Sequence, residues 1–272
     1  MGESTVYANI AVYVVEGLLV FFIVYKIISA RRGRQLFIRR IPGLSALDEA
    51  VGRATEMGRP MLFTPGLSGL SIIGLQAMAI MSHIVKRAAK YGTRVIVPTA
   101  DPLLYTVAEE VAKDAYNAEG VPEQFNPEDI RYLSDNQFAW ASGVVGTLHR
   151  EKVATAFYFG YYAAESLILT ENGQMVGAIQ IAGTPTTTQI PFFLASCDYT
   201  IIGDEYYAAS AYLSREPTLL GSLVGQDYGK LTMIALIIVG AIAVTLGALY
   251  PDWTVVHWMQ SHFLKYFQRG VG

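Results

Sequence analysis

Cysteine, histidine and charged residues are all scarce in this chain of 272 residues. Cys197 is the single cysteine, which excludes an internal disulfide and a zinc site built from several thiolates. The four histidines are scattered without an H-E-x-x-H pattern, so the sequence predicts no metal site. Charged residues make up 16% of the chain, against about 25% in typical soluble domains. The formal net charge of −3 gives no reason to expect a nucleic-acid partner.

Complete catalytic motifs are also missing. The chain contains no G-x-S-x-G nucleophile elbow, no G-x-G-x-x-G dinucleotide fingerprint and no phosphate-binding P-loop. Cys197, in the sequence PFFLASCDY, is most simply interpreted as a small, buried, apolar residue. The sequence therefore identifies no reaction, no catalytic residue and no cofactor.

Two long apolar runs stand out against this background. Residues 6–30 are apolar apart from four positions, and five arginines follow within residues 31–40. Residues 231–249 contain no charged residue. At about 1.5 Å per residue, each run is long enough to cross the roughly 30 Å hydrocarbon core of a bilayer as a helix. We therefore expect two transmembrane helices. A cleaved signal peptide is the alternative for the first run, but the basic start of such a peptide is lacking.

The arginine cluster also predicts the orientation of the chain. Basic residues beside a spanning helix favour the cytosolic side, so both termini are expected outside and the main domain in the cytosol. The expected parts are an N-terminal anchor with its basic flank at residues 1–40, a linker helix at 41–60, a cytosolic α/β domain at 61–228, a second transmembrane helix at 229–250, and an amphipathic helix on the outer leaflet at 251–272. The lipid bilayer is thus the first expected partner.

The expected linker helix carries a resemblance to a known family. Ser45 and Asp48 form a start like a capping box, and Gly58 supplies a stop before Pro60. The sequence LDEAVGRATEMGRP, with PG in the next loop, resembles an uncharacterised family of bacterial membrane proteins that carry a domain of unknown function. The resemblance covers the anchor and the domain. It implies a location in the bacterial inner membrane and brings no assigned activity.

Between the two apolar runs, short apolar segments alternate with stretches of helical length. The short segments are rich in β-branched and aromatic residues, which is typical of buried strands. They are MLFT, RVIVPT, IRYLS, TAFYFGYY, GAIQIAG and YTIIGD. The stretches expected to be helical are residues 70–91, 102–119, 137–152, 163–175 and 189–196. This alternation predicts an α/β fold: a doubly wound, Rossmann-like, mostly parallel sheet domain inserted between two transmembrane helices.

Residues 67–85 contain no formally charged residue and form the one segment that competes with this division. A third span there would place Lys86, Arg87 and Lys90 outside, contrary to the positive-inside tendency. We therefore expect a buried helix that packs against the sheet, and a transmembrane helix is the alternative.

Candidate ligand-binding residues lie in the loops after the expected strands, because ligands of open parallel sheets bind beyond the carboxyl ends of the strands. These residues are Gly66, Ser68, Gly69, Asp101, Asp135, Thr184, Thr186, Thr187 and Thr188. Glycines at a strand-to-helix turn leave backbone N–H groups free to hold a phosphate. The alternative is that all these residues only form helix caps and turns, which favour the same residue types. A small-molecule ligand is one interpretation of the loops, and local structure is the other.

Polar and small residues within the expected spans suggest helix association. Glu16 lies near the middle of the first span, where a carboxylate is costly, and is interpreted as a helix-packing group or as part of a proton or ion relay. In the second span, Gly240, Ala243 and Gly247 place small residues along one helix, which permits close helix contact. Association within one chain or between chains would use this stripe.

The leading functional hypothesis is a membrane-anchored interaction or scaffold protein that forms a homo-oligomer or joins a larger membrane complex. It rests on the small residues of the second span, on the missing catalytic motifs and on abundant tyrosine, which suits either an interface or the edge of an apolar core. One alternative is a membrane-bound sensor or enzyme that binds a nucleotide or phosphorylated metabolite in the loops after the strands. A second alternative is an ion-pathway subunit that uses Glu16.

Overall fold

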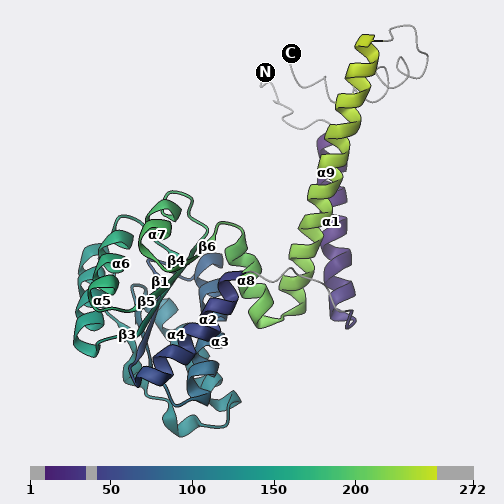
Figure 1. Ribbon diagram of the computed structural model, residues 1–272. Helices are drawn as coiled ribbons and strands as arrows, with labels where there is room; N and C mark the ends of the chain where they lie inside the picture. The colour runs from purple at the N-terminus through teal and green to yellow at the C-terminus, as the bar shows by residue number, and fades with distance from the viewer. Residues whose placement is uncertain (1–9, 35–41, 250–272) are drawn as a thin grey trace, which may run out of the picture. The chain divides into compact units, whose positions relative to one another are not determined.

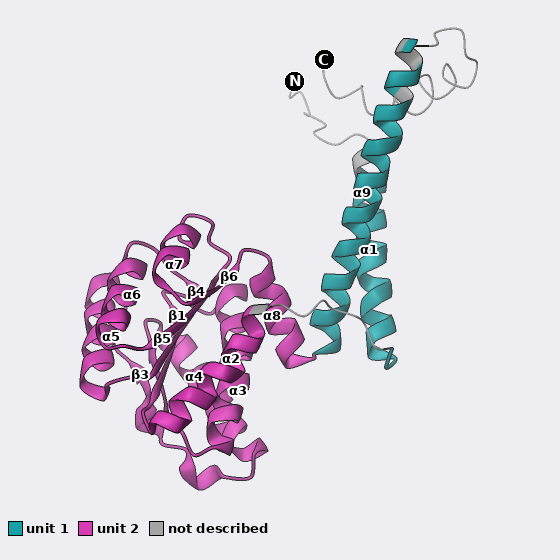
Figure 2. Ribbon diagram, viewed as in Figure 1, with its two compact units in different colours: residues 1–38, 216–272 teal, residues 39–215 magenta. Residues whose placement is uncertain are grey.

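The computed structural model describes residues 10–34 and 42–249. The chain divides into two compact units (Figure 2). One unit combines Met1–Ile38 with Glu216–Gly272, and the other is Arg39–Arg215. The helix expected as a linker at residues 41–60 thus falls in the second unit, together with the sheet. The amphipathic helix expected at residues 251–272 lies outside the described residues.

The first unit contains two long helices, α1 at Ile10–Arg31 and α9 at Pro217–Leu249, which lie side by side (Figure 1). They run in opposite directions, because Leu19 lies beside Gly229 whereas Ile27 lies beside Gly221. Both helices are long and apolar enough to cross a membrane by length and composition. Helix α9 begins at Pro217 and therefore extends well ahead of the span expected to begin at residue 229.

The second unit is built on a sheet of six parallel strands in the order β3-β2-β1-β4-β5-β6 (Figure 1). The strands are β1 at Met61–Gly66, β2 at Val95–Thr99, β3 at Ile130–Tyr132, β4 at Thr155–Tyr161, β5 at Ile179–Thr184 and β6 at Tyr199–Ile202. Each coincides with one of the six apolar segments of the sequence. The central pair is β1 and β4, and the chain winds outward from it in both directions. The predicted α/β class with a Rossmann-like parallel sheet is confirmed.

Helices cover both faces of this sheet (Figure 1). One face packs against α2 at Pro42–Met57, α3 at Ile72–Lys90, α4 at Pro102–Ala118 and α8 at Glu205–Ser214. The other face packs against α5 at Gln137–Glu151, α6 at Glu165–Met175 and α7 at Ile190–Ser196. Two short 3₁₀ turns, Pro122–Gln124 and Pro127–Asp129, connect α4 to β3. Two layers of helix therefore enclose the sheet, and the residues of its four central strands β2, β1, β4 and β5 are almost all buried.

Helix α3 settles the assignment of residues 67–85. It begins at Ile72 after a cap in which the Ser71 side chain accepts a hydrogen bond from the backbone N–H of Gly74. Along its length nine residues are buried, and they belong to the same core cluster as β1 and β2. The expected buried helix is therefore confirmed, and the segment forms part of the α/β unit.

Two local expectations need correction. Helix α2 begins at Pro42, so Ser45 lies inside the helix and does not cap it, because proline already suits the first helical turn. The expected stop is confirmed, since Gly58 follows the helix with φ +63°. Helix α8 had no counterpart among the helices expected from the sequence. It buries Tyr206 and Ala209 against the α3 side of the sheet.

Candidate functional site

The parallel sheet brings the ends of all six strands to one edge, here called the carboxyl edge, where the candidate loop residues lie. Between β1 and β4 the strand order reverses direction, and this is where open α/β sheets usually hold a ligand. In this protein the two strand ends touch each other. The backbone N–H of Leu67 donates to the carbonyl of Tyr161 at 2.8 Å, and the backbone N–H of Tyr161 donates to Ser68 Oγ at 2.8 Å.

Gly66 makes this contact geometrically feasible. Its φ of +66° is a left-handed conformation that glycine adopts easily, and a Cβ atom at this position would collide with the carbonyl oxygen of Tyr161. Ser68 is buried beneath the same contact. Gly66 and Ser68 therefore join the ends of β1 and β4 and close the crevice between these two strands.

Tyr162 fills the space below the closed crevice. Its side chain is fully buried, and its hydroxyl donates a hydrogen bond to the carbonyl of Thr64 at 2.7 Å. The ring meets Phe193 edge to face, with 5.1 Å between the ring centroids. Burial raises the pKa of Tyr162 well above its usual value, so the hydroxyl stays protonated. Tyr158 and Tyr206 are also fully buried. These tyrosines of the expected cluster therefore belong to the core.

Asp101 and Gly69 come together at the ends of β1 and β2. Asp101 Oδ1 accepts a hydrogen bond from the backbone N–H of Leu104 at 2.7 Å, which makes it the N-cap of α4. A Cβ atom at Gly69 would lie 3.5 Å from Asp101 Oδ2. At the next strand Asn136, and not Asp135, caps α5 by accepting hydrogen bonds from Phe138 and Ala139. Asp135 itself is exposed.

The threonine-rich loop after β5 is partly folded back on itself. Thr184 is fully buried, and its hydroxyl oxygen accepts a hydrogen bond from the backbone N–H of Thr186 at 3.1 Å. Thr187 is exposed. Thr188 Oγ1, also exposed, accepts a long 3.5 Å hydrogen bond from the side chain of Gln189. The four threonine hydroxyls thus have different surroundings. They do not all meet at one possible binding site.

A buried carboxylate at this edge was not found from the sequence. Glu165 has no exposed surface, and its two oxygens accept hydrogen bonds from the side chain of Gln137 at 2.6 Å and from the backbone N–H of Ala163 at 3.0 Å. Beside it, Ser166 Oγ bonds to Gln189 Oε1 at 2.8 Å. This cluster connects the segments that follow β3, β4 and β5. Its only sequence signal was an acidic residue in the first turn of α6.

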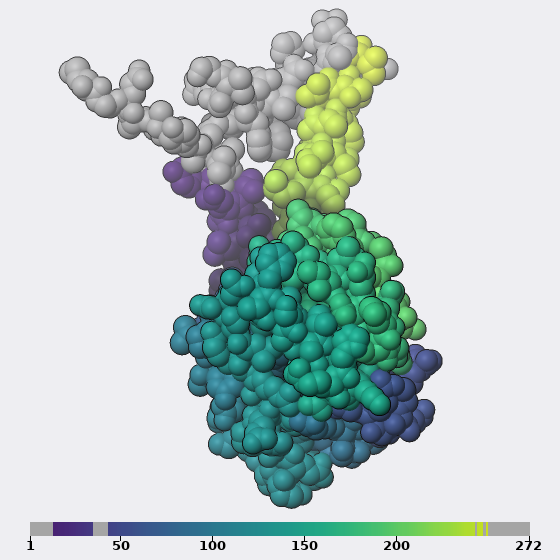
Figure 3. Space-filling model, turned by 90° about the vertical axis from the view of Figure 1, so that its left-hand side faces the viewer, coloured from purple at the N-terminus to yellow at the C-terminus, as the bar shows by residue number. Residues whose placement is uncertain are grey.

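Large exposed apolar side chains ring the carboxyl edge. At least one lies at the end of each strand or in the segment that follows it, and their exposed fractions range from 42% to 71%. We name this set the apolar rim: Leu70, Ile72, Leu103, Phe138, Tyr161, Phe192 and Ile202. Figure 3 shows the α/β unit from the side of α5 and α6, where these helices form a continuous cover.

The carboxyl edge also lacks basic side chains. Residues 64–75, 99–108, 132–142, 160–170, 184–196 and 202–214 follow the six strands and contain no lysine or arginine. They do contain Asp101, Asp135, Glu165, Asp204 and Glu205. The edge of the sheet where ligands usually bind is therefore apolar and acidic.

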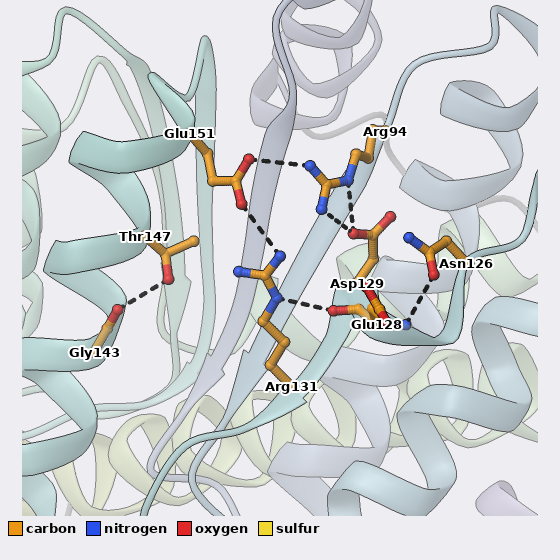
Figure 4. Close-up of polar contacts among 8 residues, drawn as sticks. All are labelled: Arg94, Asn126, Glu128, Asp129, Arg131, Gly143, Thr147 and Glu151. Atoms are coloured by element: carbon orange, nitrogen blue, oxygen red, sulfur yellow. Dashed lines mark hydrogen bonds and ion pairs between the residues drawn. The ribbon is translucent and has the colours of Figure 1, made fainter.

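The strongest ion-pair network lies at the opposite edge of the sheet (Figure 4). Arg94, just before β2, contacts Asp129 at 2.6 Å and Glu151 at 3.0 Å. Arg131, within β3, contacts the other oxygen of Glu151 at 3.2 Å. Burial alone would raise the pKa of Glu151, but the hydrogen bond from Arg131 and the charge of Arg94 outweigh it and lower this pKa. The network ties the starts of two strands to the end of α5.

A groove of about 270 Å³ also lies at this opposite edge. Residues of α2 and the starts of β5 and β6 line it, including Glu49, Arg53 and Asp198. Glu49 and Arg53 pair with each other at 2.6 Å, and Asp198 accepts a hydrogen bond from the backbone N–H of Gln180 at 2.7 Å. The charged side chains of this groove thus already form an ion pair or a hydrogen bond within the protein.

Three glycines at four-residue spacing hold the helix pair of the first unit together. Cβ atoms at Gly221 and Gly225 would lie 2.5 Å and 2.6 Å from the Cα atoms of Ile27 and Ile23 on α1. Gly229 lies beside Leu19 in the same way. This spacing permits the backbones of two helices to approach closely. It was readable in the sequence TLLGSLVGQDYGK, which precedes the charge-free run.

The residues that were expected to mediate helix association, Gly240, Ala243, Gly247 and Glu16, are not shown to contact another helix in the described structure. A Cβ atom at Gly240 would meet nothing within 4 Å, so in the described structure this glycine contacts no other helix. Ala243 and Gly247 belong to α9, and their side-chain surroundings lie outside the description. Glu16 is exposed on α1. Gly221, Gly225 and Gly229, which precede the charge-free run, make the contact between α1 and α9, and Gly240 within that run does not.

Neither a metal centre nor a reactive thiol emerges from the described residues. Within residues 10–34 and 42–249, no group of three or more His, Cys, Asp or Glu side chains is placed to hold a metal ion. Burial raises the pKa of Cys197 to about 12, so its sulfur remains a protonated thiol at neutral pH.

The fold and the two long apolar helices define a chain that joins a Rossmann-like parallel α/β unit to a separate helix pair. The chain belongs to the family described as DUF6754, a domain of unknown function, and the match covers residues 3–254. The resemblance to a domain of unknown function is thereby confirmed over nearly the whole chain. No curated protein and no solved structure matches the sequence.

Proposed function

We propose that this protein is a membrane-anchored interaction protein. Its α/β unit joins copies of itself or other subunits of a membrane complex through the carboxyl edge of the sheet. The observation that carries the proposal is the apolar rim, which surrounds a closed crevice at the place where a related fold would hold a small ligand. Exposed apolar surface of this kind is typical of binding sites for other macromolecules.

The charge of this edge supports a protein partner over a phosphorylated ligand. Nucleotides and phosphometabolites are usually held by lysine, arginine or free backbone N–H groups. The segments after the strands contain no basic residue, and the backbone N–H groups of Gly66, Leu67 and Ser68 already donate hydrogen bonds within the protein. An apolar partner segment that carries basic side chains would complement both the rim and its acidic neighbours.

The anchoring part of the proposal rests on α1 and α9. Both have the length and composition of spanning helices, and five arginines lie in residues 31–40, at the end of α1 and after it. Such a basic cluster favours the cytosolic side of a bilayer. We therefore propose that the α/β unit lies on the cytosolic side of a bacterial inner membrane, with both termini outside.

Rim variants test the interaction. Ile72 and Leu103 are 71% and 62% exposed, so replacing both by serine should leave the core intact. In the full chain, solubilised in a mild detergent, Ile72→Ser with Leu103→Ser should weaken assembly by about tenfold or more, because exposed apolar anchors dominate such contacts. Native mass spectrometry across a dilution series measures this.

A matched control separates the rim from general surface hydrophobicity. Met57 is 47% exposed at the end of α2, on the side of the sheet where β1 begins, and Met57→Ser should leave assembly unchanged. If the wild-type chain runs strictly as a monomer and no stoichiometric partner copurifies, the interaction proposal is wrong. Equal assembly of the rim variant and the wild type would place the interface elsewhere.

A nucleotide or phosphometabolite sensor remains the second candidate, and one contact favours it. Asp101 and Gly69 meet at the ends of β1 and β2, where a ribose hydroxyl could reach the free Oδ2 oxygen. Thermal-shift measurements with nucleotides and sugar phosphates distinguish the two candidates. A ligand at 100 times its Kd would stabilise the fold by about 2.7 kcal/mol. The interaction proposal expects no such shift.

A further inference from the structure

The helix pair carries a small groove between aromatic side chains. Phe21, Phe22, Tyr25 and Lys26 of α1 and Tyr228 of α9 line about 120 Å³ of space, and we name it the aromatic groove. Phe22 and Tyr228 face each other across the two helices with ring centroids 6.0 Å apart. Phe21 and Tyr25 stack at 6.1 Å along α1. Three of these rings remain widely exposed: Phe21, Tyr25 and Tyr228.

Lys26 places a positive charge in this groove. Its Nζ atom lies 3.9 Å from the centroid of the Tyr228 ring and 6.0 Å from that of Tyr25. Within the described part of the chain, Lys26 forms no ion pair with a carboxylate. A ring face attracts an ammonium ion by only about 0.5 to 2 kcal/mol, whereas a nearby anion attracts it more strongly in surroundings of low dielectric constant. The groove therefore combines apolar walls with one uncompensated cation.

The position of the groove relative to the ends of the helices narrows the choice of ligand. Lys26 is five residues before Arg31, which corresponds to about 7 Å along the helix. Arg31 donates a hydrogen bond to Thr218 Oγ1 at 3.3 Å and is followed by the basic flank. If the pair spans a bilayer as proposed above, Lys26 lies just below the cytosolic headgroups. Lysine and aromatic side chains gather at this depth of membrane proteins.

We propose that the aromatic groove binds one anionic phospholipid of the inner leaflet. An acyl chain lies against Phe21, Phe22 and Tyr25, and a phosphate oxygen accepts a charge-assisted hydrogen bond from Lys26 Nζ. A lipid without a positive headgroup, such as phosphatidylglycerol, suits the site better than phosphatidylcholine, whose ammonium group would compete with Lys26. This inference rests on the proposed membrane anchoring and gives the helix pair a ligand of its own.

Lipid competition in nanodiscs tests the proposal. The full chain is reconstituted in an equimolar mixture of phosphatidylglycerol and phosphatidylcholine, and native mass spectrometry measures the lipids that stay bound. We expect phosphatidylglycerol to be enriched by about tenfold in the wild type, the ratio that a charge-assisted hydrogen bond supplies. Lys26→Gln should abolish the enrichment. Lys230→Gln, a lysine of the same helix pair outside the groove, should preserve it.

A second variant keeps the test decisive if Lys26→Gln disturbs the helix pair. Tyr228→Leu keeps the cation and removes one ring, so it should reduce the retention of both lipids.

Equal binding of the two lipids by the wild type, or unchanged enrichment in Lys26→Gln, would overturn the lipid site. Loss of a cross-linked second chain in Lys26→Gln, with lipid binding unchanged, would show that protein fills the groove. Release of the wild type from membranes by alkaline carbonate would instead refute the anchoring itself.

Discussion

Gly66 sets the distance between the two central strands of the sheet. In related doubly wound folds, glycine at this turn lets the backbone approach a bound phosphate. Here the same freedom lets β1 approach β4, and the backbone of Tyr161 occupies the space that a ligand would need. Glycine at this turn can thus serve ligand binding or strand packing. The group that lies against it, a phosphate or the backbone of a neighbouring strand, determines which.

The first prediction concerns this glycine. Gly66→Ala combines a left-handed φ of +66° with a collision against the Tyr161 carbonyl, so we expect the free energy of unfolding to fall by about 3 kcal/mol or more. Urea denaturation of the full chain in detergent measures the loss. Gly120→Ala is the control, because Gly120 has φ +75° but a Cβ there meets nothing within 4 Å. It should cost only about 1 kcal/mol. Equal losses would show that the contact with β4 is unimportant.

At the residue scale, the sequence located the carboxyl-edge residues but did not determine their roles. Asp101 and Thr184 were recognised as loop residues after strands, and each now has a hydrogen bond within its own turn. Glu165 was not predicted as a site residue, because its hydrogen-bond partner Gln137 is 28 residues away and only the sheet order brings the two side chains together. Residue type predicts that a side chain seeks a hydrogen bond, whereas long-range folding decides which partner it finds.

The ion-pair network at the opposite edge shows how single residues connect elements. Arg94, Asp129, Arg131 and Glu151 come from β2, β3 and their flanking segments, and together they fasten an edge strand of only three residues. A strand this short has few backbone hydrogen bonds of its own. Side-chain pairs at its start therefore contribute to its position in the sheet.

A pH-dependent loss of stability should follow from this network. The pKa of Glu151 is lowered in the folded protein, so its pairing adds stability above the usual pKa near 4.5 and loses it as the pH falls through the folded-state pKa. Glu151→Gln should lower the free energy of unfolding by about 0.5 to 1 kcal/mol at neutral pH, because the network is partly exposed. The difference from the wild type should shrink as the pH falls through the lowered folded-state pKa of Glu151 and vanish below it.

Urea titrations of both proteins at neutral and acidic pH measure this difference. Glu110→Gln serves as the control, because Glu110 approaches Lys113 only at 4.0 Å on an exposed helix face. It should behave like the wild type at both pH values. A Glu151→Gln effect that persists unchanged in acid would mean that the carboxylate charge is not its cause.

The elements themselves were largely readable from the sequence. All six strands were predicted, because each is a short run rich in β-branched or aromatic residues between helical stretches. Helix α8 was not, since Glu205–Ser214 is short and lies between a strand and the long helix α9. Association of the two long helices within one chain was among the expectations, and α1 does pair with α9. The contact was expected at small residues of the charge-free run, whereas the contacting glycines Gly221, Gly225 and Gly229 precede that run.

The third prediction separates these two sets of glycines. Gly225→Leu would force its side chain into the backbone of Ile23, so we expect the helix pair to lose about 1 to 3 kcal/mol of stability. Gly240→Leu should be tolerated, because a Cβ there meets nothing within 4 Å. Circular dichroism during titration with sodium dodecyl sulfate measures the midpoint of helix-pair unfolding. A larger shift for Gly240→Leu would indicate that an interface between chains, formed at Gly240, dominates.

Across the whole molecule, charge is distributed unevenly along the chain. Five arginines lie in residues 31–40, at the end of α1 and after it, whereas the segments at the carboxyl edge of the sheet contain none. An anionic membrane surface attracts the first region and repels the acidic edge. Under the proposed anchoring, the arginines stay at the bilayer and the apolar rim stays available for a protein partner. The same asymmetry makes the orientation of the chain testable.

The last prediction addresses this orientation through the single cysteine. Burial keeps Cys197 as a poorly reactive thiol, and Cys197→Ser gives a background free of cysteine. In that background, Ser4→Cys should react with a membrane-impermeant maleimide on intact bacterial spheroplasts. Tyr91→Cys, at a 53% exposed position of the α/β unit, should react only after permeabilisation. Labelling of Tyr91→Cys on intact spheroplasts would reverse the proposed topology. If neither residue reacts until permeabilisation, the N-terminus and the α/β unit both lie inside. The arginine cluster would then not determine the side on which the N-terminus lies.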